Sequence, residues 1–139
     1  MIPRGKRHAA RAVVAMLPIW SIAGCPNAPA PDDGGKVSFA AQVQPILTAS
    51  CAGCHQPGGF ADLAGSDLDL RTGVAYDELL SGDAEHTLVM PGDPSASFLF
   101  EKISSDNPSE GSRMPLNGSL SDTDIETIRA WIAEGASDN

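Results

Sequence analysis

Aromatic residues are scarce in this chain of 139 residues: four Phe, two Trp and one Tyr make up only 5% of it. The length suits one domain and is too short for two ordinary ones, which excludes large barrel enzymes and long repeat arrays. Apolar residues still make up 42% of the chain, so a disordered polyanion is excluded as well. We therefore expect one compact body with few large flat side chains to fill its core.

Basic residues are also few. Nine Lys and Arg stand against 18 Asp and Glu, and four of the nine lie in the first 24 residues. From residue 25 onward, five basic residues face all 18 acidic ones, which gives a formal net charge of −13. Such a charge repels nucleic acid and anionic lipid headgroups, so we expect neither as a partner. A charged protein partner is expected to present a basic surface.

The chain lacks the run of about 20 apolar residues that a membrane-spanning helix needs. The apolar run from Ala12 to Trp20 is shorter, and Pro18 interrupts it. It follows a basic start and precedes the small residues Ala23 and Gly24. This order predicts that residues 1–24 are an export signal.

The end of this signal, Ile22-Ala23-Gly24-Cys25, resembles the bacterial lipobox. The resemblance implies a lipoprotein signal and a diacylglyceryl thioether on Cys25, although ordinary cleavage that leaves Cys25 as a spare thiol stays open. Residues 25–36 are rich in Pro, Gly and Asp and predict a flexible linker. A single domain is then expected over residues 37–139, on the extracytoplasmic side of a bacterial membrane (the periplasm) and anchored through Cys25.

The segment Cys51-Ala52-Gly53-Cys54-His55 carries the clearest chemical pattern. Two thiols three residues apart on one helical turn can add to the two vinyl groups along one edge of a haem, and the next residue then lies under the iron. The spacing predicts one covalently attached haem c, with Cys51 and Cys54 bound to the porphyrin and His55 to the iron. Three alternatives remain. A structural zinc site requires four ligands, and a thioredoxin-like dithiol requires a preceding strand. A simple disulfide would explain the two Cys residues but not His55.

Residues 39–136 resemble a small class I c-type cytochrome domain of the kind found in planctomycete and myxobacterial proteins. The resemblance implies an all-α, cytochrome c-like fold of about four short helices with long loops around one haem c. It also implies that the Met of a Met-Pro pair, here Met114, is the second axial ligand. Besides the haem motif, the matching pieces are Val43-Gln44-Pro45-Ile46-Leu47, Pro91-Gly92-Asp93-Pro94, Ser97-Phe98-Leu99, Arg113-Met114-Pro115-Leu116, and the stretch from Leu120 to Ala136.

The residues alone leave the second axial ligand open. Met114, Met90 and His86 are the candidates outside the export signal, and an open position is the fourth alternative. Met114 lies in the Gly- and Ser-rich segment 107–118, which lacks helical periodicity and predicts a loop. Met90 precedes Pro91 in a similar turn, so its position does not exclude it, but we expect Met90 to be core filler, as a lone Met commonly is. His/Met ligation raises the reduction potential and suits electron transfer, whereas an open site permits peroxide or gas chemistry.

Apolar spacing predicts the helices in the first half of the domain. Phe39, Val43, Ile46 and Leu47 form one stripe, which predicts a helix before the haem motif that is either kinked or divided at Pro45. A second helix is expected over residues 72–81, with Gly82 as its stop.

Two more helices are expected in the second half. One begins at the cap Asp93 and continues through Ile103, and the other lies between the cap Ser121 and Gly135, with Asp124 completing a capping box. In class I cytochromes the first and last helices cross, so the resemblance implies that Phe39 and Val43 pack near Ile128 and Ile132. Trp131 and Tyr76 are expected in the core, with contact to the haem edge as the alternative.

The sequence thus predicts an exported mono-haem electron carrier and not an enzyme, because no catalytic acid, base or nucleophile is implied. Redox proteins with a basic docking surface are the expected partners. An accessory haem subunit of a dehydrogenase or oxidase is the first alternative, and a peroxidase or gas sensor is the second.

Overall fold

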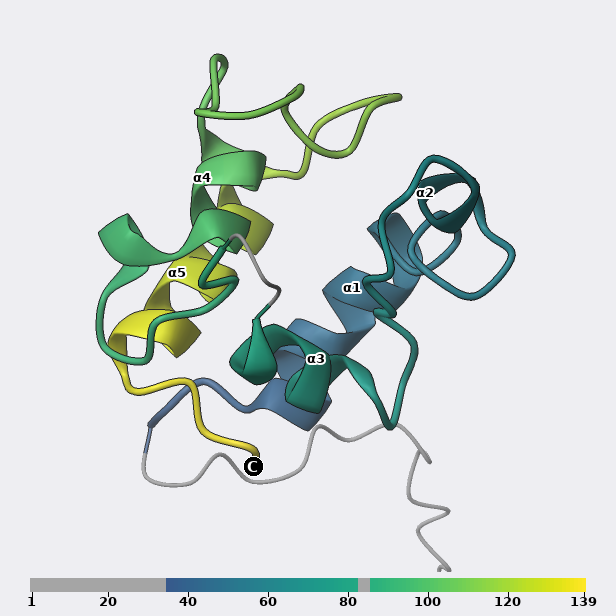
Figure 1. Ribbon diagram of the computed structural model, residues 1–139. Coiled ribbons are helices and arrows are strands. Elements are labelled where there is room, and N and C mark those ends of the chain that lie inside the picture. The colour runs from purple at the N-terminus through teal and green to yellow at the C-terminus, as the bar shows by residue number, and fades with distance from the viewer. Residues whose placement is uncertain (1–34, 83–85) are drawn as a thin grey trace, which may run out of the picture.

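The structure is a computed structural model that describes residues 35–82 and 86–139 (Figure 1). The export signal and Cys25 lie outside the described residues. Every regular element in those two ranges is helical, which confirms the predicted all-α fold. The elements, in chain order, are the π-helical turn η1 (Phe39–Val43), α1 (Gln44–Ser50), α2 (Phe60–Leu63), α3 (Ala75–Ser81), the 3-10 turn η2 (Pro94–Ala96), α4 (Phe98–Ser104) and α5 (Asp122–Ala133).

The first helix of the domain is continuous but changes its winding immediately before Pro45. Ser38 caps it, since its hydroxyl accepts a hydrogen bond from the Ala41 N–H at 3.2 Å. The N–H groups of Val43 and Gln44 then reach back five residues, which defines the π turn. Pro45 falls in the first turn of α1, a position that tolerates its fixed φ and missing N–H. The haem motif follows directly after the C-terminal end of α1.

The first and last helices pack against each other, as predicted. Phe39 and Val43 on η1 are buried, as are Ile128 and Ile132 on α5, and η1 contacts α5 directly. Burial of such side chains contributes about 1.5–3 kcal/mol each. The crossing of η1 and α5 is therefore the centre of the core.

Three aromatic rings meet beside this crossing. The ring of Phe39 lies 5.2 Å from that of Tyr76 and 5.1 Å from that of Trp131, between centroids. The Trp131 indole donates to the Ser137 carbonyl at 2.9 Å, and the Tyr76 hydroxyl donates to the Ala136 carbonyl at 3.0 Å. Both polar groups are thus satisfied by the segment after α5, and the structure assigns both rings to the protein core.

The helix predicted over residues 72–81 begins three residues later, at Ala75. The N–H groups of Val74 and Ala75 both bond to the Arg71 carbonyl, so a tight turn precedes the helix. Gly73 adopts φ +90° in this turn, which is outside the helical region. The stop at Gly82, with φ +67°, is where the sequence predicts it.

The single helix predicted from Asp93 through Ile103 is wrong, because Ser97 is extended and separates η2 from α4. The Ser97 hydroxyl is buried, accepts from the Met90 N–H at 2.8 Å and donates to the Asp93 carbonyl at 2.8 Å. The backbone N–H of Phe98 bonds to the Thr87 carbonyl at 3.1 Å. These bonds fix a turn that an unbroken helix would not allow.

The last helix is the element that the sequence describes best. The Ser121 hydroxyl accepts from the Asp124 N–H at 3.1 Å and donates to the Asp124 carboxylate at 2.7 Å. Gly135, with φ +105°, ends the helix. The C-terminal end of α5 also accepts the Gly92 N–H at the Ile132 carbonyl, at 2.7 Å, which docks the turn before η2 onto α5.

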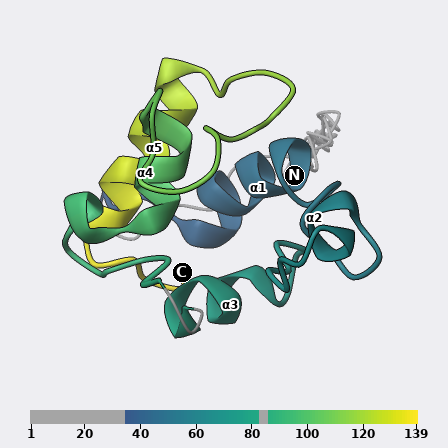
Figure 2. The ribbon, with the colours of Figure 1, turned by 45° about the horizontal axis from the view of Figure 1, so that its top comes forward.

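Figure 2 shows the elements arranged around a ring, with α1 and α2 on one side, α3 below, and α4 with α5 on the other side. In both Figures 1 and 2 the loop over residues 105–118 extends from α4 toward the side that carries α1 and α2. In the ranges that the structure describes, no helix has the length and hydropathy of a membrane span.

Candidate functional site

The haem motif forms a compact turn at the end of α1. Cys51 caps the helix through its N–H bond to the Leu47 carbonyl at 2.9 Å. The N–H groups of Cys54 and His55 both bond to the Cys51 carbonyl at 3.0 Å. This turn brings the two sulfur-bearing residues and the imidazole together on one short segment, as the spacing predicts.

Both sulfurs in this turn are free thiols. Cys54 is exposed and Cys51 is partly buried. Burial, with a smaller contribution from neighbouring Cys54, raises the pKa of Cys51 from 9.0 to about 11. Cys51 is therefore a neutral thiol at physiological pH, and neither sulfur is committed to a disulfide.

His55 combines a neutral ring with an unused ring nitrogen. Burial lowers its pKa below the usual 6.5, because the charged imidazolium loses hydration there. Its Nδ1 atom is buried and has no hydrogen-bond partner among the described residues. Metal binding requires a neutral imidazole, so these observations fit an iron ligand.

The chain after the motif folds back onto it. The Ala61 N–H donates to the Cys54 carbonyl at 3.1 Å, and the Gln56 amide donates to the Gly53 carbonyl at 3.2 Å. Gly59 is required here because a Cβ atom at this position would lie 2.3 Å from the Cys54 carbonyl oxygen. A side chain at residue 59 would displace the backbone of the motif.

A second connection fixes the backbone of His55. Its carbonyl accepts the Leu70 N–H at 2.9 Å. The Leu70 carbonyl in turn accepts from the amide of Gln44 at 3.3 Å, and the same amide nitrogen bonds to Thr48 at 3.2 Å. Gln44 is a buried polar residue of α1, so it ties the segment around Leu70 to the helix that carries the motif. Sequence reasoning gave Gln44 no role at the site, and the available signal was a polar residue directly beside the apolar Val43.

Large apolar side chains are exposed beside the motif and beside Met114. Phe60 and Leu63 on α2 are 64% and 81% exposed, and Leu116 in the 105–118 loop is 54% exposed. Exposed apolar side chains beside a motif can form part of a binding surface. The two thiols and the imidazole of the motif fit a large, flat, apolar group held by two thioethers and an imidazole, and Phe60 and Leu63 follow the motif closely in sequence.

Comparison with protein families agrees with this geometry. Residues 51–115 match the family described as Planctomycete cytochrome C. The chain contains a small c-type cytochrome domain. The match begins at the first Cys of the motif and ends immediately after Met114, so it spans both candidate ligand regions of the domain. No curated protein and no solved structure matched the chain.

The three candidates for the second axial position of the cytochrome domain lie in different settings. Met114 is partly buried, and its N–H bonds to the Lys102 carbonyl at 2.7 Å. Met90 lies in the turn that Ser97 fixes and is exposed, so the expectation that it fills the core is wrong. The His86 ring stacks on Phe98, with centroids 4.0 Å apart. Its Nε2 lies 3.3 Å from a carboxylate oxygen of Glu110.

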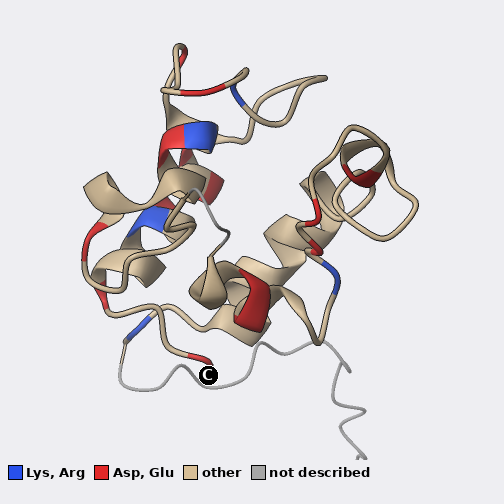
Figure 3. Ribbon diagram, in the orientation of Figure 1, with Lys and Arg blue, Asp and Glu red and all other residues tan. Residues whose placement is uncertain are grey.

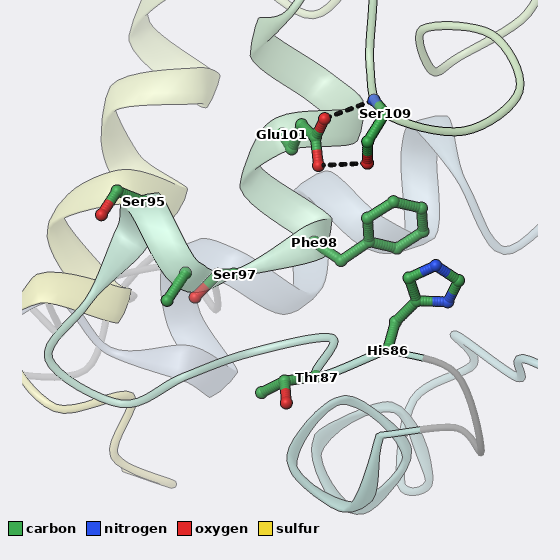
Figure 4. A pocket seen from close by; sticks show the side chains of 8 residues that line it. His86, Thr87, Ser95, Ser97, Phe98, Glu101 and Ser109 are labelled. Atoms are coloured by element: carbon green, nitrogen blue, oxygen red, sulfur yellow. Dashed lines mark hydrogen bonds between the residues drawn. The ribbon is translucent and has the colours of Figure 1, made fainter.

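A hollow of about 290 Å³ lies on the cytochrome domain near α4 (Figure 4). Its lining is mostly polar and contains none of the motif residues, and of the three axial candidates it includes only His86. In the residues that the structure describes, no three His, Cys, Asp or Glu side chains gather closely enough to hold a metal ion. Sequence reasoning did not anticipate this hollow, which is lined by His86, Thr87, Ser95, Ala96, Ser97, Phe98, Glu101 and Ser109.

Proposed function

We propose that this protein is a mono-haem c-type cytochrome that carries single electrons between redox partners outside the cytoplasm. The observation that carries the proposal is the turn at residues 51–55, which combines two free thiols with a neutral imidazole whose Nδ1 has no partner among the described residues. A c-type haem supplies, when bound, an iron that takes up and releases one electron.

In this proposal, each residue of the motif has a separate task. Cys51 and Cys54 bind the porphyrin through thioether bonds, which leaves neither sulfur available for zinc or for disulfide exchange. His55 would ligate the iron through its imidazole. Burial keeps its imidazole unprotonated, and the bond from Leu70 to its carbonyl restrains the backbone that carries it.

Met114 is the proposed second axial ligand. Its backbone bond to Lys102 fixes it at the base of the loop that extends toward the motif side of the molecule. The neighbouring Leu116 is exposed and would lose contact with water beside a porphyrin. An iron held by the Met114 thioether and the His55 imidazole would have no open position for peroxide or gas, which favours electron transfer.

The proposal includes a lipid anchor on Cys25 and a basic redox partner. Domains of the c-type cytochrome class are typically extracytoplasmic, in agreement with an export signal over residues 1–24. Figure 3 shows acidic positions on α2, α3 and α5 and few basic positions between them. The net charge of −13 from residue 25 onward supports a partner whose docking surface is basic.

The test of the proposal is spectroscopy on the full chain produced with the haem maturation machinery. We expect a pyridine haemochrome spectrum of thioether-linked haem, a colour that resists acidified acetone, and its loss in the Cys51→Ser/Cys54→Ser variant. Colourless exported protein, or pigment that washes out with acidified acetone, refutes the proposal.

The second ligand is tested separately on the ferric protein. We expect the long-wavelength band of thioether-ligated iron, and we expect the variant Met114→Ala to lose it. The matched control Met90→Ala should keep it, because Met90 lies in the separate turn fixed by Ser97. Loss of the band in Met90→Ala with retention in Met114→Ala would show that the wrong methionine has been assigned.

A further inference from the structure

The loop over residues 105–118 has no regular secondary structure, yet hydrogen bonds fasten it to α4 at several points. Glu101, three residues before the last residue of α4, makes the first attachment. One oxygen of its carboxylate accepts the Ser109 N–H, and the other accepts the Ser109 hydroxyl at 2.9 Å. Figure 4 shows both bonds between the helix and the loop. The middle of the loop is thus held against α4 by a charged acceptor that uses both of its oxygens.

Arg113 makes the second attachment, beside the proposed ligand. Its Nε donates to the Ile103 carbonyl at 3.1 Å, and one terminal nitrogen donates to the Asp106 carboxylate at 2.5 Å. The Ile103 carbonyl belongs to the last turn of α4, whose carbonyls lack partners within the helix. A guanidinium at this end also interacts favourably with the helix dipole. Arg113 therefore closes the loop onto α4 one residue before Met114.

The remaining contacts reinforce these two. The Met114 N–H bonds to the Lys102 carbonyl at 2.7 Å, and the Lys102 ammonium donates to the Glu110 carbonyl at 2.7 Å. The Glu110 side chain lies 3.3 Å from His86. We call the contacts of Glu101 with Ser109, and of Arg113 with Ile103 and Asp106, the α4 clamp.

We propose that Glu101 and Arg113 are positioning residues which, through the α4 clamp, hold Met114 in place as an axial ligand. The inference rests on the proposed function, because it presupposes a haem ligated by Met114. Because Arg113 and the Met114 N–H both bond to carbonyls of α4, the clamp limits the displacement of the backbone that carries the Met114 thioether. The clamp therefore stabilises the ligated state relative to the open one, and its loss makes the open state more populated.

The experiment measures carbon monoxide binding to the ferrous holoprotein, because this gas competes for the position that Met114 occupies. Removing the charged hydrogen bonds of one clamp residue should increase the observed binding rate about tenfold in Arg113→Ala and in Glu101→Ala. Ser109→Ala removes only the hydroxyl bond and should produce a smaller increase. The long-wavelength band of the ferric protein should be weaker in both alanine variants.

Matched controls come from α5. Arg129 and Glu126 pair with each other at 2.7 Å on the exposed side of that helix, and among the described residues neither side chain forms a hydrogen bond or ion pair with the loop. The variants Arg129→Ala and Glu126→Ala should bind carbon monoxide at the rate of the unmodified protein. The conservative variant Glu101→Gln keeps an oxygen acceptor for Ser109, so its binding rate should lie between those of Glu101→Ala and the unmodified protein.

The outcomes separate the clamp from the function. Fast binding in Met114→Ala with unchanged rates in Arg113→Ala and Glu101→Ala overturns the clamp and leaves the proposed function standing. Equal increases of the binding rate in the clamp variants and in the α5 controls also overturn the clamp, because the effect is then a general loss of domain stability. Slow binding in Met114→Ala overturns the assignment of this ligand and the clamp with it. Absence of covalent haem refutes the proposed function itself.

Discussion

Replacement of Gly59 by alanine tests whether the chain after the haem motif is closed against the backbone of the motif. The new Cβ atom would lie 2.3 Å from the carbonyl oxygen of Cys54 and 2.9 Å from that of Gln56. Since Cβ atoms essentially never approach a neighbour within 3.0 Å, the two backbones must separate by about 0.7 Å. This movement strains the bond from the Ala61 N–H to the Cys54 carbonyl. Overpacking of this kind destabilises by about 1–3 kcal/mol.

Gly53→Ala is the matched control, because Gly53 lies inside the motif and a Cβ there meets no atom within 4 Å. At a compatible backbone position the same change is neutral or stabilises by up to about 1 kcal/mol. The measurement is urea unfolding of both haem-loaded variants, followed by far-UV circular dichroism, together with the fraction of chain that carries haem. If Gly59→Ala unfolds at the same urea concentration as Gly53→Ala, the close approach of the loop to the motif is refuted.

Three further predictions concern the rest of the domain. Ser97→Ala should lower the free energy of unfolding by about 1–3 kcal/mol, because it leaves the Met90 N–H without its partner. The control Ser95→Ala, at an exposed position, should change this free energy little, and equal effects of the two variants in urea titrations would contradict the buried role of Ser97. In reduced, haem-free protein at pH 8, iodoacetamide should alkylate Cys54 well before Cys51, because a pKa raised to about 11 makes the Cys51 thiolate about a hundredfold rarer than at the usual pKa of 9.0. Mass spectrometry of both sites measures the two alkylation rates, and similar rates would disprove the burial of Cys51. Electron transfer to a basic redox partner should slow as salt concentration rises, and stopped-flow rates that do not depend on salt would exclude electrostatic steering by the acidic surface.

The last helix could be predicted in detail because its signals are local. The hydroxyl of Ser121, the carboxylate of Asp124 and the φ of Gly135 act within a few residues of the helix ends, so the sequence contains the whole argument. The haem motif is equally local, since its five residues form one turn. Its chemistry follows from the residue types and their spacing.

The break at Ser97 could not be predicted in the same way. Asp93 and Pro94 are a good helix start, and the apolar spacing continues through Ile103, so nothing nearby indicates an interruption. The extended conformation of Ser97 depends on hydrogen bonds to the turn at Met90, and the neighbouring Phe98 bonds to the segment before that turn. Tertiary bonds of this kind override local propensity.

The attachment of the 105–118 loop to α4 was also beyond the sequence. Its composition predicts a loop, and the resemblance implies a ligand in it, but neither identifies which residues restrain it. Arg113 and Glu101 are twelve positions apart, and no local sequence pattern connects them. Their roles become visible only when the unpaired carbonyls at the end of α4 and the loop are seen together.

The entry of the chain into the domain has a mechanical consequence. The N–H of Val37 bonds to the Glu134 carboxylate at 2.7 Å, and the Ser38 hydroxyl and the Phe39 N–H bond to Asn139 at 2.6 and 3.0 Å. Tension applied along residues 25–36 is therefore shared between these bonds and the covalent chain that continues into η1 and α1. Part of a pull on the linker is then borne by Glu134 and Asn139 at this junction, which precedes the turn at residues 51–55.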